Sequence, residues 1–276
     1  MLRNNRFARR CSMYNRRSSD PRQFPIDKKG DIDFEFSFAF QPIVDVGKQE
    51  INSFEALIRG PNGEPAASVL NQVSYENIFG FDERCRWKAI EMASRLNIPN
   101  RLSINISAKG LYQVDLNITA TFIASRNNGF PVKNIIFEVV ESENLTDHRN
   151  LLKNLRLLQD FGFTTAIDDF GMGYSGLKLL LEYQPNIIKL DRELVSDIHK
   201  NPVKQCIFSG IQCMCQKLSI DIVAEGVERV EEYIWLNKEG IDFFQGYYFA
   251  RPAFEALPMV AFQEHLAGRL CDAELR

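Results

Sequence analysis

Short apolar runs rich in β-branched and aromatic residues alternate along the chain with longer segments whose apolar residues recur at helical spacing. The short runs predict eight strands, at residues 34–44, 53–58, 102–106, 134–139, 164–168, 186–190, 220–225 and 242–247. The longer segments predict helices at residues 81–97, 112–128, 148–161, 175–183, 202–217, 229–239 and 253–267. Eight strands separated by helical segments favour an α/β fold of the (β/α)8 barrel type.

The connection between the first two predicted strands departs from this pattern. It spans only residues 45–52, whereas a parallel crossover needs about a dozen residues or more and usually contains a helix. We therefore expect an antiparallel first strand, which pairs with the second as a hairpin in an otherwise parallel barrel.

The N-terminal segment differs from the rest of the chain in charge. Residues 1–22 hold seven arginines and one acid, Asp20, and they show no hydrophobic period. We predict a basic, flexible arm over residues 1–32, a folded domain over residues 33–268 and a short tail over residues 269–276. Clustered arginines neutralise phosphates, so contact of the arm with nucleic acid or an acidic surface is the alternative to a plain leader.

The overall composition excludes several classes of protein. Hydrophobic residues make up 45% of the 276 residues, which argues against disorder over the whole chain. No apolar run approaches the roughly 18 residues of a membrane span, and the basic N-terminus lacks the apolar core of a secretory signal. The six cysteines form no C-x-x-C pair and only three histidines are present. We therefore expect reduced thiols in a cytoplasmic protein rather than a zinc cluster or a disulfide framework.

Charged or amide residues occur near the C-terminal ends of seven of the eight predicted strands. They are Glu55, Asn105, Glu138, the pair Asp168–Asp169, Lys189, Glu225 and Gln245. In a barrel these ends meet at one mouth, where catalytic groups gather. Carboxylates at one mouth would repel one another, and the single lysine offsets only one charge, so we expect one or two bound cations. Oxygen ligands without histidine or cysteine favour Mg²⁺ or Mn²⁺, and two such ions suit phosphoryl displacement.

Motifs around these residues occur in a fixed order. They are QPIVD at 41–45, FEALIRG at 54–60, NIS at 105–107, EVVES at 138–142, DDFGMGYSGL at 168–177, IIKLD at 187–191, AEGVE at 224–228 and QGYYFARP at 245–252. The set resembles the EAL domain, a family of bacterial cyclic di-GMP phosphodiesterases, from about residue 34 to residue 265. The stretch FDERCRWKAI at 81–90 is also similar to EAL domains joined to blue-light-sensing BLUF modules, although we find no BLUF module in this sequence.

The resemblance implies a TIM-like barrel with one antiparallel strand, and hydrolysis of cyclic di-GMP to linear pGpG. The metal ligands that it implies are Glu55, Asn105, Glu138, Asp168, Asp169 and Glu225. The catalytic residues that it implies are Lys189, Asp169 and Glu225, with Lys189 beside the attacking water. The substrate-binding residues that it implies are Arg59, Gln41 and Gln245, and Glu141 would anchor the loop after Asp169. Two Mg²⁺ or Mn²⁺ ions are the implied cofactor, and the implied assembly is a homodimer. Ca²⁺ should inhibit because it is larger and takes more ligands.

Two positions depart from the family pattern. Met172 and Val140 each stand where the family has threonine, so a hydroxyl that could support the loop after Asp169 is missing. Neither residue is an implied metal ligand. Three alternatives to a cyclic di-GMP phosphodiesterase stay open: an EAL-type receptor or protein-interaction module with little turnover, a nucleic-acid regulator that uses the arm, and an unrelated metal-dependent barrel enzyme of the enolase type.

Overall fold

The structure is a computed structural model, and it describes residues 32–107, 114–140, 148–171, 176–260 and 262. Within these residues nine strands form one sheet, in the order β2-β3-β4-β5-β6-β7-β8-β1-β9, and β1 also pairs with β2. The strands are β1 (Ser37–Asp45), β2 (Glu50–Arg59), β3 (Arg101–Asn105), β4 (Ile135–Val140), β5 (Thr164–Phe170), β6 (Ile187–Leu190), β7 (Asp221–Ala224), β8 (Phe243–Phe244) and β9 (Ala253–Phe254). Because β1 pairs with both β2 and β8, the first eight strands close into a barrel.

The direction of the strands follows the lengths of the connections. Neighbouring strands from β2 to β8 run parallel, whereas β1 is antiparallel to β2 and to β8. In the β1–β2 hairpin Gln41 lies opposite Glu55. The predicted antiparallel first strand and the mixed α/β barrel are thus confirmed.

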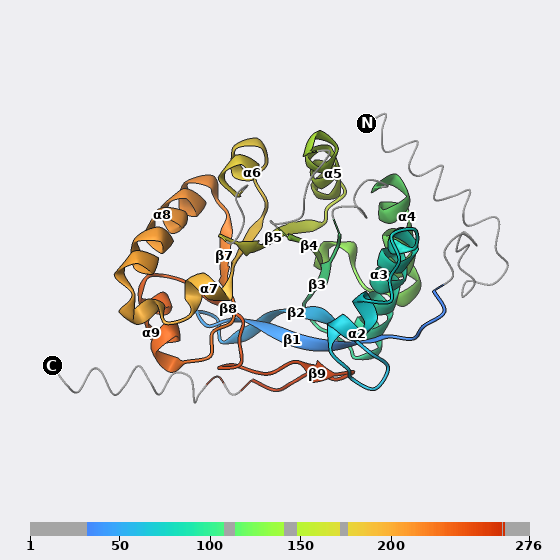
Figure 1. Cartoon of the computed structure of the whole chain (residues 1–276), viewed down its shortest axis with the longest axis horizontal. Coiled ribbons are helices and arrows are strands. Elements are labelled where there is room, and N and C mark those ends of the chain that lie inside the picture. Colours follow the sequence, from blue (N-terminus) through green and yellow to red (C-terminus); the bar gives the residue numbers. More distant parts are fainter. Residues whose placement is uncertain (1–31, 108–113, 141–147, 172–175, 261, 263–276) are drawn as a thin grey trace.

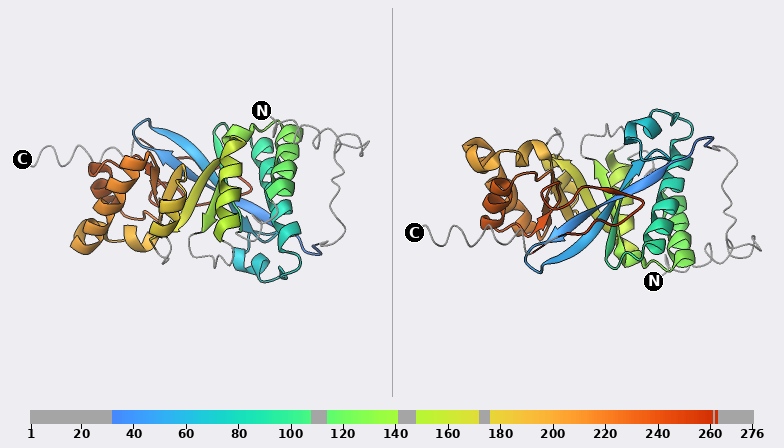
Figure 2. Two further views of the ribbon diagram at one scale, coloured as in Figure 1. Left: turned by 90° about the horizontal axis from the view of Figure 1, so that it is seen from above. Right: turned by 90° about the horizontal axis from the view of Figure 1, so that it is seen from below.

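The helices surround the parallel part of the barrel (Figure 1). They are α2 (Ala66–Leu70), α3 (Ile78–Arg95), α4 (Val114–Asn128), α5 (His148–Asp160), α6 (Gly176–Glu182), α7 (Arg192–Val195), α8 (Pro202–Leu218) and α9 (Val230–Lys238), with 3-10 turns η2 (Val132–Asn134) and η3 (Ile198–Lys200). The chain around β9 crosses the outer side of the β1–β2 hairpin instead of a helix (Figure 2). None of the helices in the described part of the chain is long and apolar enough to cross a membrane.

Local sequence explains where the helices form. Leu151, Leu155 and Leu158 of α5 are buried, as their helical spacing predicts. Helix α8 begins after Asn201, whose side chain accepts the backbone N–H groups of Val203 and Lys204 at 3.1 and 3.2 Å.

The predicted helix at 253–267 is wrong over residues 253–260, and residues 261 and 263–267 lie outside the described residues. Ala253 and Phe254 instead pair with β1, and the N–H of Glu255 donates to the carbonyl of Phe38 at 3.0 Å. Pro258 cannot supply the backbone donor that a helix interior needs. Residues 253 and 254 therefore form a strand on the edge of β1 instead of the start of a helix. The short helices α2 and α7 were not predicted.

Apolar residues form two separate clusters. The larger one fills the space between the helices and the outer side of the strands. The smaller one lies inside the barrel and consists of Ile43, Ile136, Ala166, Ile187 and Val223. The inner cluster lies directly beneath the polar residues at the mouth of the barrel.

Candidate functional site

Strand alternation places a polar layer directly above the inner apolar cluster. Side chains two positions apart on a strand share a face of the sheet. Glu138, Asp168, Lys189 and Glu225 each follow a member of that cluster by two residues: Ile136, Ala166, Ile187 and Val223 respectively. Gln41 precedes Ile43 by two residues, as expected for the strand that runs the other way. The sequence therefore folds these polar side chains into one layer at the mouth of the barrel.

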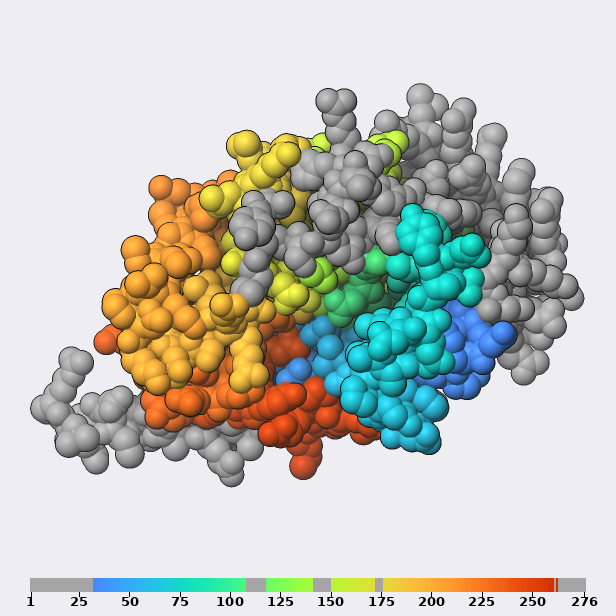
Figure 3. Space-filling model, in the orientation of Figure 1, coloured from blue at the N-terminus to red at the C-terminus, as the bar shows by residue number. Residues whose placement is uncertain are grey.

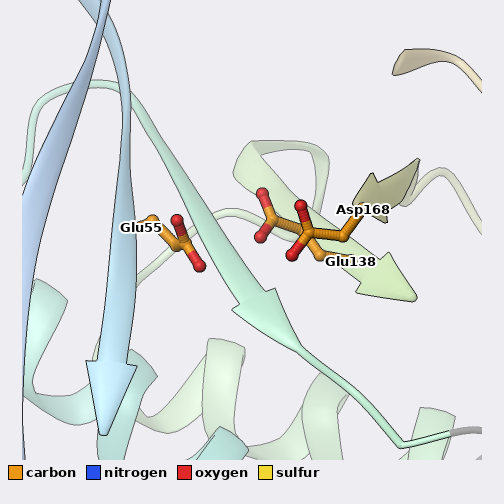
Figure 4. A group of neighbouring side chains, drawn as sticks. All are labelled: Glu55, Glu138 and Asp168. Atoms are coloured by element: carbon orange, nitrogen blue, oxygen red, sulfur yellow. The ribbon is translucent and has the colours of Figure 1, made fainter. Parts of the chain in front are cut away.

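Lys189 lies at the centre of the polar layer and is 1% exposed. Its Nζ atom is 2.6 Å from Glu225 Oε1, 2.8 Å from Glu138 Oε2, 3.1 Å from Asp168 Oδ1 and 3.4 Å from Glu55 Oε2. The carboxylates of Glu55, Glu138 and Asp168 approach one another from three strands (Figure 4). One buried ammonium group thus contacts four carboxylates.

Side-chain amides hold the Glu55 carboxylate from two sides. Gln245 Nε2 donates to Glu55 Oε2 at 2.8 Å, and Asn105 Nδ2 donates to Glu55 Oε1 at 2.9 Å. Gln245 also donates to Gln41 Oε1 at 3.2 Å. These contacts bring together residues from β1, β2 and β3 with the residue after β8, all of which were predicted from the sequence to lie at the mouth or in the motifs around it.

A bulge at the end of β5 turns two consecutive carboxylates toward the mouth. The pairing of β5 with β6 shifts register between Ile167 and Phe170, and Asp169 has a φ of 54°. This left-handed conformation is uncommon for a residue with a Cβ atom. The N–H of Asp169 donates to Asp168 Oδ1 at 3.1 Å. Both aspartates can therefore line one cavity, although they are adjacent in sequence.

Burial and mutual repulsion raise the pKa values of Glu138, Asp169 and Glu225 in the cluster. Burial raises the pKa of Glu138 to about 8, and the charges of Glu55 and Asp168 add to this against the opposing effect of Lys189. Burial, together with the charges of Asp168 and Asp191, raises the pKa of Asp169 to about 6. Burial also raises the pKa of Glu225.

The same surroundings raise the pKa of Lys189 as well, which favours its charged form. Burial disfavours its charged form, but the four surrounding carboxylates outweigh burial and raise the pKa of Lys189 well above its ordinary value. Lys189 is therefore protonated and positively charged near neutral pH.

The polar layer opens into a cavity of about 330 Å³. Its wall includes Glu55, Asp168, Asp169, Lys189, Glu225 and Gln245. The molecular surface is hollowed at this mouth, between the side that carries α7 and α8 and the side that carries α2 and α3 (Figure 3). Glu138 lies beneath the cavity as a fully buried member of the cluster.

Several residues that were not predicted also line the cavity, among them Asp191, Arg192, Glu228 and Tyr247. Asp191, Glu228 and Tyr247 lie within motifs of the sequence, and Arg192 follows one directly. These motifs are the signal that could have found them. Asp191 also caps α7, since its Oδ1 accepts the N–H of Glu193 at 2.5 Å.

One predicted residue lies away from the cavity, and two residues singled out from the sequence cannot be placed. Arg59 ends β2 and donates from Nη1 to the carbonyl of Ile58 at 2.7 Å, and it is not among the residues that line the cavity. Glu141 and Met172 lie outside the described residues. Val140 is described, and it pairs with Asp168 across β4 and β5.

The chemistry of the cluster fits a divalent cation. Carboxylate oxygens of Glu55, Glu138 and Asp168 lie within 4.8 Å of one another, and so do those of Asp168, Asp169 and Glu225. The other oxygen of Glu138, Oε1, is buried and has no hydrogen-bond partner among the described residues. An anionic, all-oxygen donor set with a buried unsatisfied acceptor suits a hard metal ion such as Mg²⁺, Mn²⁺ or Ca²⁺. Asp168 belongs to both groups.

Comparison with known proteins decides the family. The model of the EAL domain matches residues 31–252 of this chain. The chain belongs to the EAL domain family. Among curated relatives of this EAL domain, the blue light- and temperature-regulated antirepressor BluF of Escherichia coli K12 is 32% identical over 228 residues, which are 82% of this chain and 57% of BluF. The cyclic di-GMP phosphodiesterase PdeR of the same organism is 32% identical over 232 residues, or 81% of this chain and 34% of PdeR. The chain thus spans between about a third and just over half of these relatives.

Solved EAL structures match the same region. A standalone EAL protein from Vibrio cholerae O395 with bound c-di-GMP is 42% identical, with a TM-score of 0.82, and the match covers 84% of this chain and 99% of that one. Klebsiella pneumoniae BlrP1, in a complex with manganese and c-di-GMP, is 37% identical with a TM-score of 0.78, over 82% of this chain and 57% of BlrP1. The (β/α)8 fold expected from the sequence is the fold of these structures.

Proposed function

We propose that this EAL domain hydrolyses one phosphodiester bond of cyclic di-GMP and gives linear pGpG. The observation that carries the proposal is the cluster of buried carboxylates around Lys189, at the mouth of a barrel that matches c-di-GMP-bound EAL structures. Every residue type that the family motifs place in the cluster is present in this chain. PdeR, which is named a cyclic di-GMP phosphodiesterase, supports the same reaction.

We propose that two Mg²⁺ or Mn²⁺ ions serve as cofactors. Glu55, Asn105, Glu138 and Asp168 would hold one ion, and Asp168, Asp169 and Glu225 would hold the other, which agrees with the two carboxylate groups of the cluster. When bound, such ions lower the pKa of water and neutralise charge on phosphate oxygens. Ca²⁺ should support substrate binding but inhibit turnover, because it is larger and takes more ligands in looser geometry.

The chain's own residues orient the attacking water and the substrate. Lys189 keeps its proton, so it donates hydrogen bonds and offsets negative charge rather than acting as a base. Asp169 faces the cavity and, with its pKa at about 6, is largely ionised near neutral pH, where it can accept a hydrogen bond from the water. Glu225, 2.6 Å from Lys189, is proposed to support this arrangement.

Three further residues are proposed to bind substrate. Gln41 and Gln245 line the cavity, and Gln245 Nε2 donates to Gln41 Oε1 at 3.2 Å. Arg59 stands at the end of β2 with its guanidinium group held by the Ile58 carbonyl through one nitrogen. The planar fork of a guanidinium group matches phosphate oxygens, so Arg59 is proposed to contact a substrate phosphate with its other donors.

The proposal is tested by incubating the protein with cyclic di-GMP and Mn²⁺ and separating the products by chromatography. We expect pGpG to form with Mn²⁺ or Mg²⁺ and not with Ca²⁺ or a chelator. Glu55→Ala is the matched control and should form none. Substrate that persists with the wild-type protein at every metal concentration contradicts the proposal.

A second function is favoured by the name of one relative. BluF, which is 32% identical to this chain over the matched region, is named an antirepressor rather than a phosphodiesterase. The second proposal is therefore that this chain binds cyclic di-GMP, or a partner protein, with little turnover. Tight binding of cyclic di-GMP without product formation would support this receptor function over the enzyme.

Assembly and location are further proposals. We propose a homodimer that packs near the loop after Asp169, and light scattering during size-exclusion chromatography measures the mass that decides it. We also propose that the protein works in the cytoplasm. Cys85, Cys206, Cys213 and Cys215 are free thiols, in keeping with a reducing compartment. Cell fractionation tests this location.

A further inference from the structure

Two neighbouring segments form one wall of the cavity. The segment after β6, residues 191–197, carries Asp191 and Arg192, and the loop after β7, residues 225–229, carries Glu225 and Glu228. Side chains from both segments face the same space. The site therefore depends on how these two segments sit against each other.

The carboxylate of Glu232, in the first turn of α9, joins the two segments. Its Oε2 accepts the backbone N–H groups of Glu228 and Arg229, both at 3.1 Å, and its Oε1 accepts the N–H of Asp197 at 2.8 Å. The side chain is 2% exposed. One buried anionic group thus receives backbone donors from the loop after β7 and from the chain that follows α7.

The surrounding contacts show that the two segments are closely packed. A Cβ atom on Gly226 would lie 2.6 Å from Cβ of Arg192, so any residue other than glycine at this position would force Arg192 to move. The Arg192 Nη2 atom lies 2.8 Å from Glu228 Oε2, and Arg229 Nη1 lies 3.0 Å from Asp197 Oδ1. These ion pairs are exposed and contribute little on their own. The hydrogen bonds of the Glu232 carboxylate, by contrast, are buried and therefore little screened by water.

The Asp197 end of the link is also in an unusual conformation. Asp197 has a φ of 55°, in the left-handed region that residues with a Cβ atom rarely occupy. Such a conformation persists only where the surroundings hold it. The hydrogen bond from the Asp197 N–H to Glu232 is one contact that does so.

We propose that Glu232 is a positioning residue, which sets the placement of Glu225 relative to Lys189 and Asp191 by tying the loop after β7 to the segment after β6. The inference rests on the proposed function, because its readout is the affinity of the site for a divalent metal. Glu225 lies three residues before Glu228, and its carboxylate is 2.6 Å from Lys189, so a shift of the loop moves it directly. Groups that orient metal ligands are often nearly as important for affinity as the ligands themselves.

The plainer alternative is that Glu232 only caps α9. An acid in the first turn that accepts the N–H groups before the helix stabilises the helix and need not affect the site. The contact with Asp197, 35 residues earlier in the chain, goes beyond such a cap. A control that removes a cap without touching the loop after β7 separates the two roles.

Three variants make the test: Glu232→Ala, Glu232→Gln and Asn201→Ala. Asn201 lies close to Asp197 in the chain, and Asn201→Ala removes the cap of α8. This change leaves the Glu232 contacts in place. Glu232→Gln keeps one oxygen that can accept the N–H groups of Glu228 and Arg229, but its NH₂ group cannot accept the N–H of Asp197. The measurements are Mn²⁺ Kd by calorimetry, kcat and KM for cyclic di-GMP, and the thermal unfolding midpoint.

We expect Glu232→Ala to raise the Mn²⁺ Kd by about 10-fold or more and Glu232→Gln to raise it by a smaller factor. Asn201→Ala should lower the unfolding midpoint as Glu232→Ala does, but leave the Mn²⁺ Kd unchanged. If Glu232→Ala does not fold, Glu232→Gln against Asn201→Ala decides the question. Equal Mn²⁺ affinity in wild type and the Glu232 variants overturns this inference alone. A wild-type protein that binds no Mn²⁺ overturns the proposed function and this inference with it.

Discussion

The interior of the barrel consists of two adjoining layers with opposite chemistry. The lower layer is apolar and contains Ile43, Ile136, Ala166, Ile187 and Val223. The upper layer, one side-chain step along the same strands, holds Lys189 among four carboxylates. Both layers face the inside of the barrel, and they differ only in the residue types that occupy successive inward positions of the strands.

The difference separates what stabilises this fold from what gives it a function. Each buried isoleucine or valine of the lower layer stabilises the fold by about 1.5–3 kcal/mol through removal of apolar surface from water. Burial in the upper layer instead disfavours charge, as the raised pKa values of Glu138 and Glu225 record. A layer that opposes folding in this way is expected where a ligand of opposite charge is to be bound. The predictions below test this separation.

The largest effect is expected for Glu55→Ala in the upper layer. This change removes a carboxylate that contacts Lys189, Gln245 and Asn105, and that we assign to a metal ion. A site of hard oxygen ligands cannot replace that oxygen with a methyl group, so turnover should fall below detection. The rate of pGpG formation is the measurement, and Ile43→Val in the lower layer is the control that should keep it. Ordinary hydrolysis by Glu55→Ala would show that the metal assignment is wrong.

The next largest effect concerns Lys189. We expect kcat to fall by about 10²-fold or more in both Lys189→Ala and Lys189→Arg, comparable to the loss of one electrostatic stabiliser. Arginine keeps the charge but differs in shape and reach, and the space between Glu138 and Glu225 is narrow. Substrate Kd, measured by calorimetry with Ca²⁺ to block turnover, should change little.

Two outcomes would contradict this assignment of Lys189. Wild-type turnover by Lys189→Arg would mean that only charge is needed at this position. A loss of substrate binding in parallel with kcat would make Lys189 a substrate anchor rather than a group that orients water.

The opposite pattern is expected in the lower layer. Ile187→Ala deletes a 5% exposed side chain directly beneath Lys189 and should lower the free energy of unfolding by about 2–5 kcal/mol. Because no polar contact is removed, kcat of the folded fraction should stay within a few-fold of wild type. Denaturant unfolding and kcat at low temperature measure the two effects. A loss of kcat as large as that of Lys189→Ala, with unchanged stability, would show that the two layers are not separable.

The upper layer was predictable from sequence because its residues lie at the ends of recognisable strands. The alternation from Ile136 to Glu138, or from Ile187 to Lys189, is visible without a structure. The short 45–52 connection likewise predicted the antiparallel strand. The contribution of Asp191 and Glu228 to the cavity was missed, since an acid after a strand is most often a cap and only the packing of two loops turns both toward one space.

Other features depend on contacts between distant parts of the chain. Residues 253–260 form β9 and a turn rather than a helix, because the edge of β1 offers backbone partners that local sequence does not reveal. The bulge that turns Asp169 toward the mouth follows from the register of β5 with β6. Glu232 lies in none of the sequence motifs, and only its three backbone contacts point to the positioning role that we propose for it.

A smaller effect is expected on raising the pH of the metal-free protein. The pKa of Glu138 is raised from an ordinary value near 4.5 to about 8, so the folded state binds more protons than the unfolded state between these values. Its contribution to stability is therefore present in full below pH 4.5 and is lost as the pH rises through about 8. Asp169 acts in the same sense between about 3.8 and 6. Each such group lowers the free energy of unfolding by up to roughly 1.4 kcal/mol per pH unit within its window.

Denaturant unfolding in EDTA at pH 6 and pH 8 measures this fall. Added Mn²⁺ should reduce it, since a bound cation stabilises the ionised carboxylates. Glu138→Gln should also reduce it, because glutamine does not titrate. Stability that is constant or rises from pH 6 to pH 8 without metal would mean that the upper layer does not oppose folding through its charge.

The smallest effect is expected for removal of residues 1–30, which include none of the residues named in either layer. The first strand begins at Ser37, and the first residue among those that line the cavity is Gln41, so every residue of the described site lies outside the deleted segment. Specific activity should stay within about 2-fold of the full chain, which is well under the effect of one lost hydrogen bond to a charged group. A gel shift with nucleic acid over a range of salt concentrations, on the full and the shortened chain, tests the arginine-rich segment separately, because phosphate contacts weaken steeply with salt. Loss of activity on deletion would mean that the segment completes the fold or the assembly, whereas loss of a salt-sensitive shift alone would assign it to nucleic-acid contact.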